Sequence, residues 1–178
     1  MIILFVFLSF ISFFLLLWQI SNLISVFFGC PYVKTGHDVI RKALKLADIK
    51  KGDVFYDLGC GNGDVLIKAS KMGAKCIGFE ISPYYYIIGK IRIRIYLFFA
   101  RAKNKDISIE FRNIQNVNLQ DADVIYCYLV PKFLNKLSTK FKRELKPSAR
   151  LISIGFPIVG LKLSKKIIYK SRAIFIYL

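Results

Sequence analysis

The chain has 178 residues, of which 55% are hydrophobic, and a formal net charge of +17. This length suits one compact domain with a short appendage, and the charge indicates an anionic partner, either nucleic acid or the cytoplasmic face of a membrane. The four cysteines, Cys30, Cys60, Cys76 and Cys127, show no C-x-x-C spacing. We therefore expect a reducing compartment, no disulfide framework and no metal site.

Residues 1–28 are expected to form a transmembrane anchor. No residue from 2 to 28 is charged, and a transmembrane helix needs roughly 20 apolar residues. A cleaved signal peptide is disfavoured because the segment has no basic start and no small-residue cleavage site before Pro31. A buried core helix is the other alternative. Four basic residues follow closely, namely Lys34, Arg41, Lys42 and Lys45. The positive-inside rule therefore predicts that the domain faces the cytoplasm.

Residues 29–48 are expected to form a linker and a first helix. Apolar residues recur at helical spacing over residues 38–46, and we expect Asp38 to cap this helix. His37 is the only histidine in the chain. It is either a base at the lip of a cofactor site or, as we prefer, a solvated linker residue.

Residues 53–64 contain the motif that carries most of the chemistry. Val54–Leu58 is predicted to be a buried parallel strand that ends in alternating glycines, and a helix is expected to begin near Asp64. Glycine permits a tight turn and the close approach of a ligand. A second strand, Lys75–Glu80, ends in a carboxylate about 20 residues after the first glycine, where α/β nucleotide sites hold a ribose diol.

Two cofactor classes share this arrangement. The dinucleotide fingerprint G-x-G-x-x-G fits poorly because the third glycine, Gly63, comes one position early. The pattern Asp-x-Gly-x-Gly-x-Gly resembles motif I of the Rossmann-like S-adenosylmethionine (AdoMet) methyltransferases, which implies AdoMet as cofactor. The cofactor-binding residues that this resemblance implies are Asp57, Gly59, Cys60, Gly61, Gly63, Glu80 and Asn113. A glycine-rich turn without a ligand is the alternative.

Ser82 and Pro83 are expected to begin a helix that extends to about residue 102. Its apolar side chains form one broad face: Tyr84, Ile87, Ile88, Ile91, Ile95, Phe98 and Phe99. The opposite, basic side holds Lys90, Arg94 and Arg101, with Ile93 and Leu97 exposed among them. This basic side is either a surface that rests on anionic lipid or an ordinary solvated face.

The remaining segments complete an α/β fold. We expect strands at 107–111, 122–128 and 150–156, a helix at 132–145, and a closing antiparallel hairpin from 166–169 and 173–178. With the motif above, this order predicts a Rossmann-like AdoMet methyltransferase sheet with helices on both faces, over a domain at 49–178. Asn113 follows the third strand, where such enzymes present a polar group to adenine.

The whole order resembles the family of the ATP synthase c-subunit lysine methyltransferase and its prokaryotic relatives. The resemblance is carried by the apolar N-terminal segment and by residues 31–33, 52–63, 78–83 and 121–129. The chain departs from the family pattern at Asn62, Asp64, Ser82 and Asn113.

This resemblance implies a membrane-anchored methyltransferase that acts on a lysine of a membrane-associated protein. Tyr128, at the end of the fourth strand, and Tyr32, in the linker, are candidates for lining the acceptor pocket, with simple packing as the alternative for each. No general base can be named. Three alternatives stay open: a lipid or isoprenoid methyltransferase, a nucleic-acid methyltransferase, and a non-catalytic AdoMet-binding membrane protein. Nucleic acid is disfavoured because the fourth strand lacks an Asn-Pro-Pro-Tyr signature.

Overall fold

The computed structural model describes residues 1–27, 33, 35–100 and 106–178, and within them seven strands form one sheet in the order β3-β2-β1-β4-β5-β7-β6. The strands are β1 (Val54–Leu58), β2 (Lys75–Glu80), β3 (Ile107–Phe111), β4 (Val124–Cys127), β5 (Arg150–Ile154), β6 (Leu163–Tyr169) and β7 (Arg172–Tyr177). β1 to β5 pair in parallel, whereas β7 runs antiparallel to both β5 and β6. The predicted Rossmann-like sheet and closing hairpin are confirmed.

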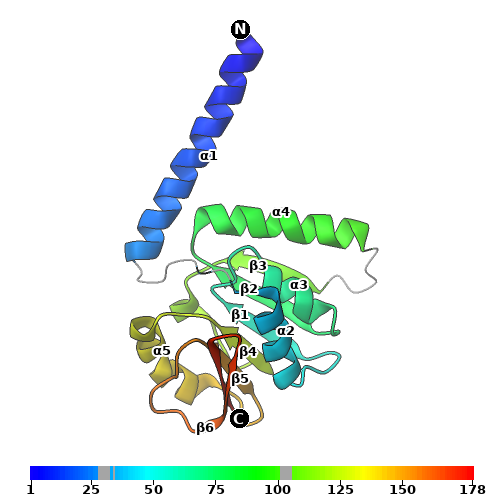
Figure 1. Ribbon diagram of the computed structural model, residues 1–178, viewed down its shortest axis with the longest axis vertical. Coiled ribbons are helices and arrows are strands. Elements are labelled where there is room, and N and C mark those ends of the chain that lie inside the picture. Colours follow the sequence, from blue (N-terminus) through cyan, green and yellow to red (C-terminus); the bar gives the residue numbers. More distant parts are fainter. Residues whose placement is uncertain (28–32, 34, 101–105) are drawn as a thin grey trace.

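Helices cover both faces of this sheet, as expected (Figure 1). They are α2 (His37–Leu46), α3 (Asp64–Ser70), α4 (Pro83–Phe99), α5 (Pro131–Glu144) and a 3₁₀ turn, η1 (Ile114–Asn116). α2, α3 and α4 bury side chains in one apolar cluster, and α5 and η1 bury theirs in a second. The central strands β1 and β4 are almost wholly buried because both of their faces are covered, and Asp57 of β1 is the charged residue among them.

The N-terminal helix α1 (Ile2–Phe27) projects away from the domain (Figure 1). By length and composition it is able to cross a membrane, with a mean hydropathy of 2.5 over its most apolar window. Among the α1 side chains that the structure describes, Ser21 is the buried one. Its Oγ accepts a hydrogen bond of 2.9 Å from the backbone N–H of Tyr84, in the first turn of α4. This bond satisfies one of the N–H groups that a helix start leaves without a partner.

Two local predictions about helices are corrected by the structure. Gly36, not Asp38, precedes α2, and no side chain caps that helix. The Asp38 carboxylate instead pairs with the Lys170 ammonium, which also lowers the pKa of Asp38 through that hydrogen bond and charge. By contrast, Ser82 caps α4 as predicted, since its Oγ accepts from the backbone N–H of Tyr85 and Pro83 occupies the first turn.

The orientation of α4 is the second correction. Ile93, expected on an exposed basic side, is buried, and Leu97 packs partly buried against the same cluster. The broad apolar face that the periodicity identified points outward instead, with Ile95 and Phe98 exposed. Arg101 lies outside the described residues.

Candidate active site

The glycine-rich loop between β1 and α3 adopts a backbone that requires glycine. Gly59, Gly61 and Gly63 have φ angles of +82°, +52° and +77°, in a region that L side chains rarely occupy. The loop is fixed to the next strand, because the N–H groups of Gly59 and Cys60 both donate to the Phe79 carbonyl, at 2.9 and 3.1 Å. The sequence motif therefore specifies the turn directly.

Two further glycines let neighbouring elements close around this loop. A Cβ on Gly78 would lie 2.5 Å from the Leu66 side chain and 2.6 Å from the Cys60 sulfur. A Cβ on Gly89 of α4 would lie 2.5 Å from Ile109 Cδ1 and 3.0 Å from the Gly61 carbonyl oxygen. Without side chains at these two positions, β2 and α4 pack directly against the loop and hold it in place.

Glu80, at the end of β2, organises the same loop with its carboxylate. Oε2 accepts from the Gly61 N–H at 2.8 Å, and Oε1 accepts from the N–H groups of Ile81 and Ser82 at 2.9 and 2.8 Å. Burial raises the pKa of Glu80, although these three hydrogen bonds lower it in part. A carboxylate has about four acceptor positions, so one on Oε2 is left for a ligand hydroxyl.

Asp57 lies beside Glu80 in a different electrostatic position. Its side chain is 3% exposed, and no described group donates a hydrogen bond to its carboxylate. Burial, followed by the negative charge of Glu80, raises the pKa of Asp57 well above its usual value. The same burial and both carboxylates raise the pKa of the Cys60 thiol. Two buried acids in one site favour a cationic ligand, because a positive charge offsets the cost of ionising them there.

These residues line one cavity of about 930 Å³, which includes its open mouth. Of the predicted site residues, the cavity brings together Asp57, Gly59, Cys60, Glu80, Asn113 and Tyr128. Gly61 and Gly63 shape the loop without lining the cavity. Tyr32 lies outside the described residues. The binding roles of all these residues stay predictions.

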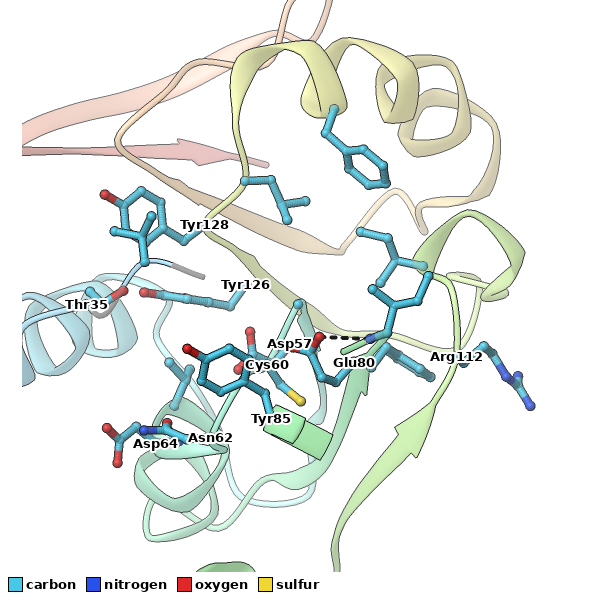
Figure 2. Close-up of a pocket in the computed structure, with 18 of the residues that line it drawn as sticks. Thr35, Asp57, Cys60, Asn62, Asp64, Glu80, Tyr85, Arg112, Tyr126 and Tyr128 are labelled. Carbon is cyan, nitrogen blue, oxygen red and sulfur yellow. Dashed lines mark hydrogen bonds between the residues drawn. The ribbon is translucent and has the colours of Figure 1, made fainter. Parts of the chain in front are cut away.

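Two tyrosines that sequence reasoning did not select also line the cavity. Tyr85 comes from the first turn of α4 and Tyr126 from β4, and Figure 2 shows their hydroxyls and that of Tyr128 directed to the side where Thr35 lies. The Tyr126 hydroxyl is buried and makes no hydrogen bond of ordinary geometry with the described residues, although Thr35 is close to it. The Tyr128 hydroxyl accepts a hydrogen bond from Arg172, at 2.7 Å.

The edges of the cavity are set by polar residues. Asn113 Oδ1 accepts from the Gln115 N–H at 3.0 Å, which caps η1 and leaves the side-chain NH₂ as a donor. Asp64, at the start of α3, pairs with Arg92 of α4 at 2.6 Å and lies 3.8 Å from His37 Nε2. Burial raises the pKa of Asp64, but the Arg92 hydrogen bond and charge outweigh it and bring that pKa below its usual value. Asp64 therefore links α3 to α4 and lies close to His37, the first residue of α2.

The donor set in this cavity fits AdoMet. The molecule carries a sulfonium and an ammonium, which would offset two buried acids, Asp57 and Glu80. Its ribose hydroxyl would find an acceptor in the remaining position on Glu80 Oε2. Residues Phe79, Ile81 and Ile114 give an apolar slot at the end of β2, in the crevice at the carboxyl ends of the parallel strands where such folds bind ligands.

Comparison with known proteins agrees with this site. The ANTKMT methyltransferase domain matches residues 57–165. A protein-lysine N-methyltransferase of Saccharolobus islandicus is 33% identical over 132 residues, which cover 73% of this chain and 79% of that protein. The human ATP synthase c-subunit lysine N-methyltransferase is 24% identical, and the mouse adenine nucleotide translocase lysine N-methyltransferase is 26% identical. The alignments cover 71% and 72% of this chain but only 52% and 54% of those two proteins.

The fold is shared with solved methyltransferases. An RNA methyltransferase from Salinibacter ruber, in complex with S-adenosyl-L-homocysteine, superposes with a TM-score of 0.75 at 23% identity and covers 82% of this chain and 92% of its own. A precorrin-6y methyltransferase from Geobacter metallireducens gives a TM-score of 0.64 at 16% identity, covering 80% and 88%. With a matching domain, a relative at 33% identity and a cavity suited to the cofactor, the chain belongs to the ANTKMT methyltransferase domain family and is an AdoMet-dependent methyltransferase.

Proposed function

We propose that this chain is a membrane-anchored protein-lysine N-methyltransferase that modifies a lysine of a membrane protein close to the bilayer surface. One observation carries the proposal. Ser21 is the residue at which α1 contacts the domain, and its hydroxyl accepts a hydrogen bond from the backbone N–H of Tyr84. The residue after Tyr84, Tyr85, lines the cofactor cavity. The cavity therefore lies beside the base of the apolar helix.

The dimensions of α1 support its role as an anchor. The exposed stretch from residue 2 to residue 20 is about 28 Å long at about 1.5 Å per residue, which matches a hydrocarbon core of about 30 Å. The described side chains in this stretch are apolar or uncharged and mostly exposed. Burial of Ser21 then marks the level at which the helix meets the domain. The basic residues that follow favour a cytoplasmic domain.

The cavity has the lining that a lysine acceptor requires. Deprotonating a lysine with a pKa of about 10.4 near pH 7.4 costs roughly 4 kcal/mol, and an apolar channel next to a cationic cofactor reduces that cost. Three tyrosines, Tyr85, Tyr126 and Tyr128, supply such a channel. The buried hydroxyl of Tyr126 is placed to accept a hydrogen bond from the incoming amine and to hold its lone pair toward the cofactor.

AdoMet supplies an electrophilic methyl group, so the protein has mainly to align donor and acceptor. Such alignment contributes on the order of 7–11 kcal/mol to lowering a barrier. Glu80 and Asp57 would bind the cofactor, and the glycine loop between β1 and α3 would let it come close to the backbone. The proton of the lysine ammonium leaves to water before transfer, because the cavity mouth is open.

The relatives support lysine as the acceptor. Their names specify lysine methylation of protein, of the ATP synthase c-subunit and of adenine nucleotide translocase. Since the chain spans about half the length of the animal relatives, we carry over the acceptor group and not the particular substrate protein.

The test incubates the full chain with radiolabelled AdoMet and membranes from cells that lack the gene. We expect label in a protein band that resists lipid extraction and RNase, and at least a tenfold loss of label with Glu80→Ala. Asp106→Ala, which removes an exposed acid outside the cavity, serves as the matched control and should keep full transfer. Label in the organic phase would replace the protein acceptor with a lipid. Binding of AdoMet without any transfer would contradict the enzymatic proposal for these membranes.

A further inference from the structure

The outward face of α4 is apolar and open to solvent in this structure. We call Ile91, Ile95, Phe98 and Phe99 the outer face of α4; their side chains are 47%, 51%, 77% and 77% exposed. At 100° per residue these four residues cluster on the side opposite the buried Ile93. A surface helix of a soluble protein instead directs polar side chains outward. The exposed apolar surface of α4 therefore indicates a binding partner.

The charges of α4 favour a lipid partner. The helix contains Lys90, Arg92 and Arg94 and no acidic residue. Arg92 is engaged by Asp64, whereas Lys90 and Arg94, both exposed, lie one turn apart along one edge of the outer face. An apolar stripe with a basic edge is the pattern of helices that lie in the interface of an anionic bilayer.

The placement of α4 relative to α1 agrees with this partner. Figure 1 shows α4 lying across the end of the domain from which α1 projects, with its axis far from parallel to that of α1. The Ser21–Tyr84 hydrogen bond ties the first turn of α4 to the base of α1. If α1 crosses the bilayer down to Ser21, α4 runs along the bilayer surface from that point.

We infer that α4 is an in-plane membrane helix whose outer face inserts into the interface of an anionic phospholipid bilayer. This inference rests on the anchoring role proposed for α1 and adds a second, independent contact. Two contacts, one across the bilayer and one along it, fix the rotation of the domain about α1. The cavity, which is lined in part by Tyr85 from α4 and Thr35 from the segment after α1, is then held close to the membrane surface.

The chain offers a direct probe because Trp18, in α1, is its only tryptophan. The full chain is reconstituted in vesicles of phosphatidylcholine and phosphatidylglycerol that carry bromine on the upper acyl chain, which quenches nearby indoles. Native Trp18 reports α1. Trp18→Phe combined with Phe98→Trp reports the outer face of α4. Trp18→Phe combined with Ile168→Trp is the matched control, since Ile168 on β6 is an equally apolar residue that is 64% exposed.

We expect bromine to quench the native Trp18 and the indole at position 98 but not the indole at position 168. Binding to anionic vesicles should exceed binding to neutral vesicles, and Lys90→Gln and Arg94→Gln should each lower that ratio about fivefold. A quenched Trp18 with an unquenched indole at position 98 would overturn the α4 inference while leaving the anchor intact. No quenching at either position would overturn both. If the indole at position 98 is shielded only when the chain forms a dimer, a second copy of the chain covers the outer face, and the lipid inference is overturned.

Discussion

Asp57→Asn is expected to stabilise the cofactor-free protein against unfolding and to lower its affinity for AdoMet. In the folded chain the Asp57 carboxylate is buried beside Glu80, and burial together with the Glu80 charge raises its pKa well above the ordinary 3.8. A raised pKa means that the group stabilises the fold below its unfolded pKa and that this stabilisation is lost as pH rises through the folded pKa. At neutral pH, which lies above the unfolded pKa, burying Asp57 therefore costs stability, whereas an asparagine at this position carries no such cost.

The magnitudes follow from the burial. Replacing an unpaired buried charge with a neutral isostere adds on the order of 1 kcal/mol to the free energy of unfolding, or about 2–4 °C in Tm for a chain of this size. Losing a charge-assisted contact to the cofactor costs about 1.5–3 kcal/mol, which weakens AdoMet binding about 10- to 150-fold. At 100 times the native Kd, AdoMet adds about 2.7 kcal/mol to the native chain but only about 0.9 kcal/mol to a variant that binds 30-fold more weakly.

Thermal unfolding of the full chain in detergent, with and without AdoMet, measures both effects. The native chain should gain about 5–11 °C from the ligand, and the Asp57→Asn variant about 2–4 °C from a higher starting Tm. A free variant that unfolds at a lower temperature than the native chain would refute the electrostatic argument. An unchanged ligand shift would refute the assignment of Asp57 to the cofactor site.

Four further predictions test the parts of the site separately. Glu80→Gln should lower both Tm and AdoMet affinity, because an amide cannot accept hydrogen bonds at both of its ends as the carboxylate does; calorimetric titration and thermal unfolding would show an unaltered variant if the loop does not depend on it. Asp123→Asn should destabilise the chain near neutral pH with unchanged AdoMet affinity, since a backbone hydrogen bond lowers the pKa of Asp123; urea unfolding should show that the difference disappears as pH falls through that lowered pKa. Tyr126→Phe should reduce kcat/KM about tenfold without altering AdoMet affinity, and equal activity would remove its hydroxyl from the acceptor site. Gly89→Ala should destabilise by about 1–3 kcal/mol through overpacking, and Ile109→Val should relieve part of that loss in a double-mutant cycle.

The fold was predictable from the sequence where the signal is local. The strand, glycine turn, helix and terminal acid from residue 54 to residue 80 are specified by neighbouring residues, and the structure places them as expected. The Ser82 cap followed by Pro83 was equally readable. The position of β7 between β5 and β6 depends on pairing between distant segments, which no local pattern encodes.

The orientation of α4 could not be read from periodicity alone. A helical apolar stripe shows that one face avoids water, but not whether that face meets the protein core or another apolar phase. Here Gly89 and Ile93 are the α4 residues that face the domain, because the glycine loop lies so close to the helix that larger side chains do not fit between them. The larger stripe, including Phe98, is left outside.

The candidate site was predicted in part for a similar reason. Asp57 and Glu80 belong to a recognisable motif, whereas Tyr85 and Tyr126 come from a helix and a strand in which an aromatic residue ordinarily signals packing. Only the fold brings their hydroxyls to the same side of one cavity. The burial of a hydroxyl without a hydrogen-bond partner among the described residues, which marks Tyr126, has no counterpart in the sequence.

We expect methyl transfer to reach a lysine in the same bilayer that holds the enzyme. The most direct measurement reconstitutes the full chain and acceptor membrane proteins either in the same vesicles or in separate ones, and compares transfer from radiolabelled AdoMet. Because the cavity lies beside α1, we expect transfer in shared vesicles and little transfer between separate vesicles. Equal transfer in both arrangements would contradict it.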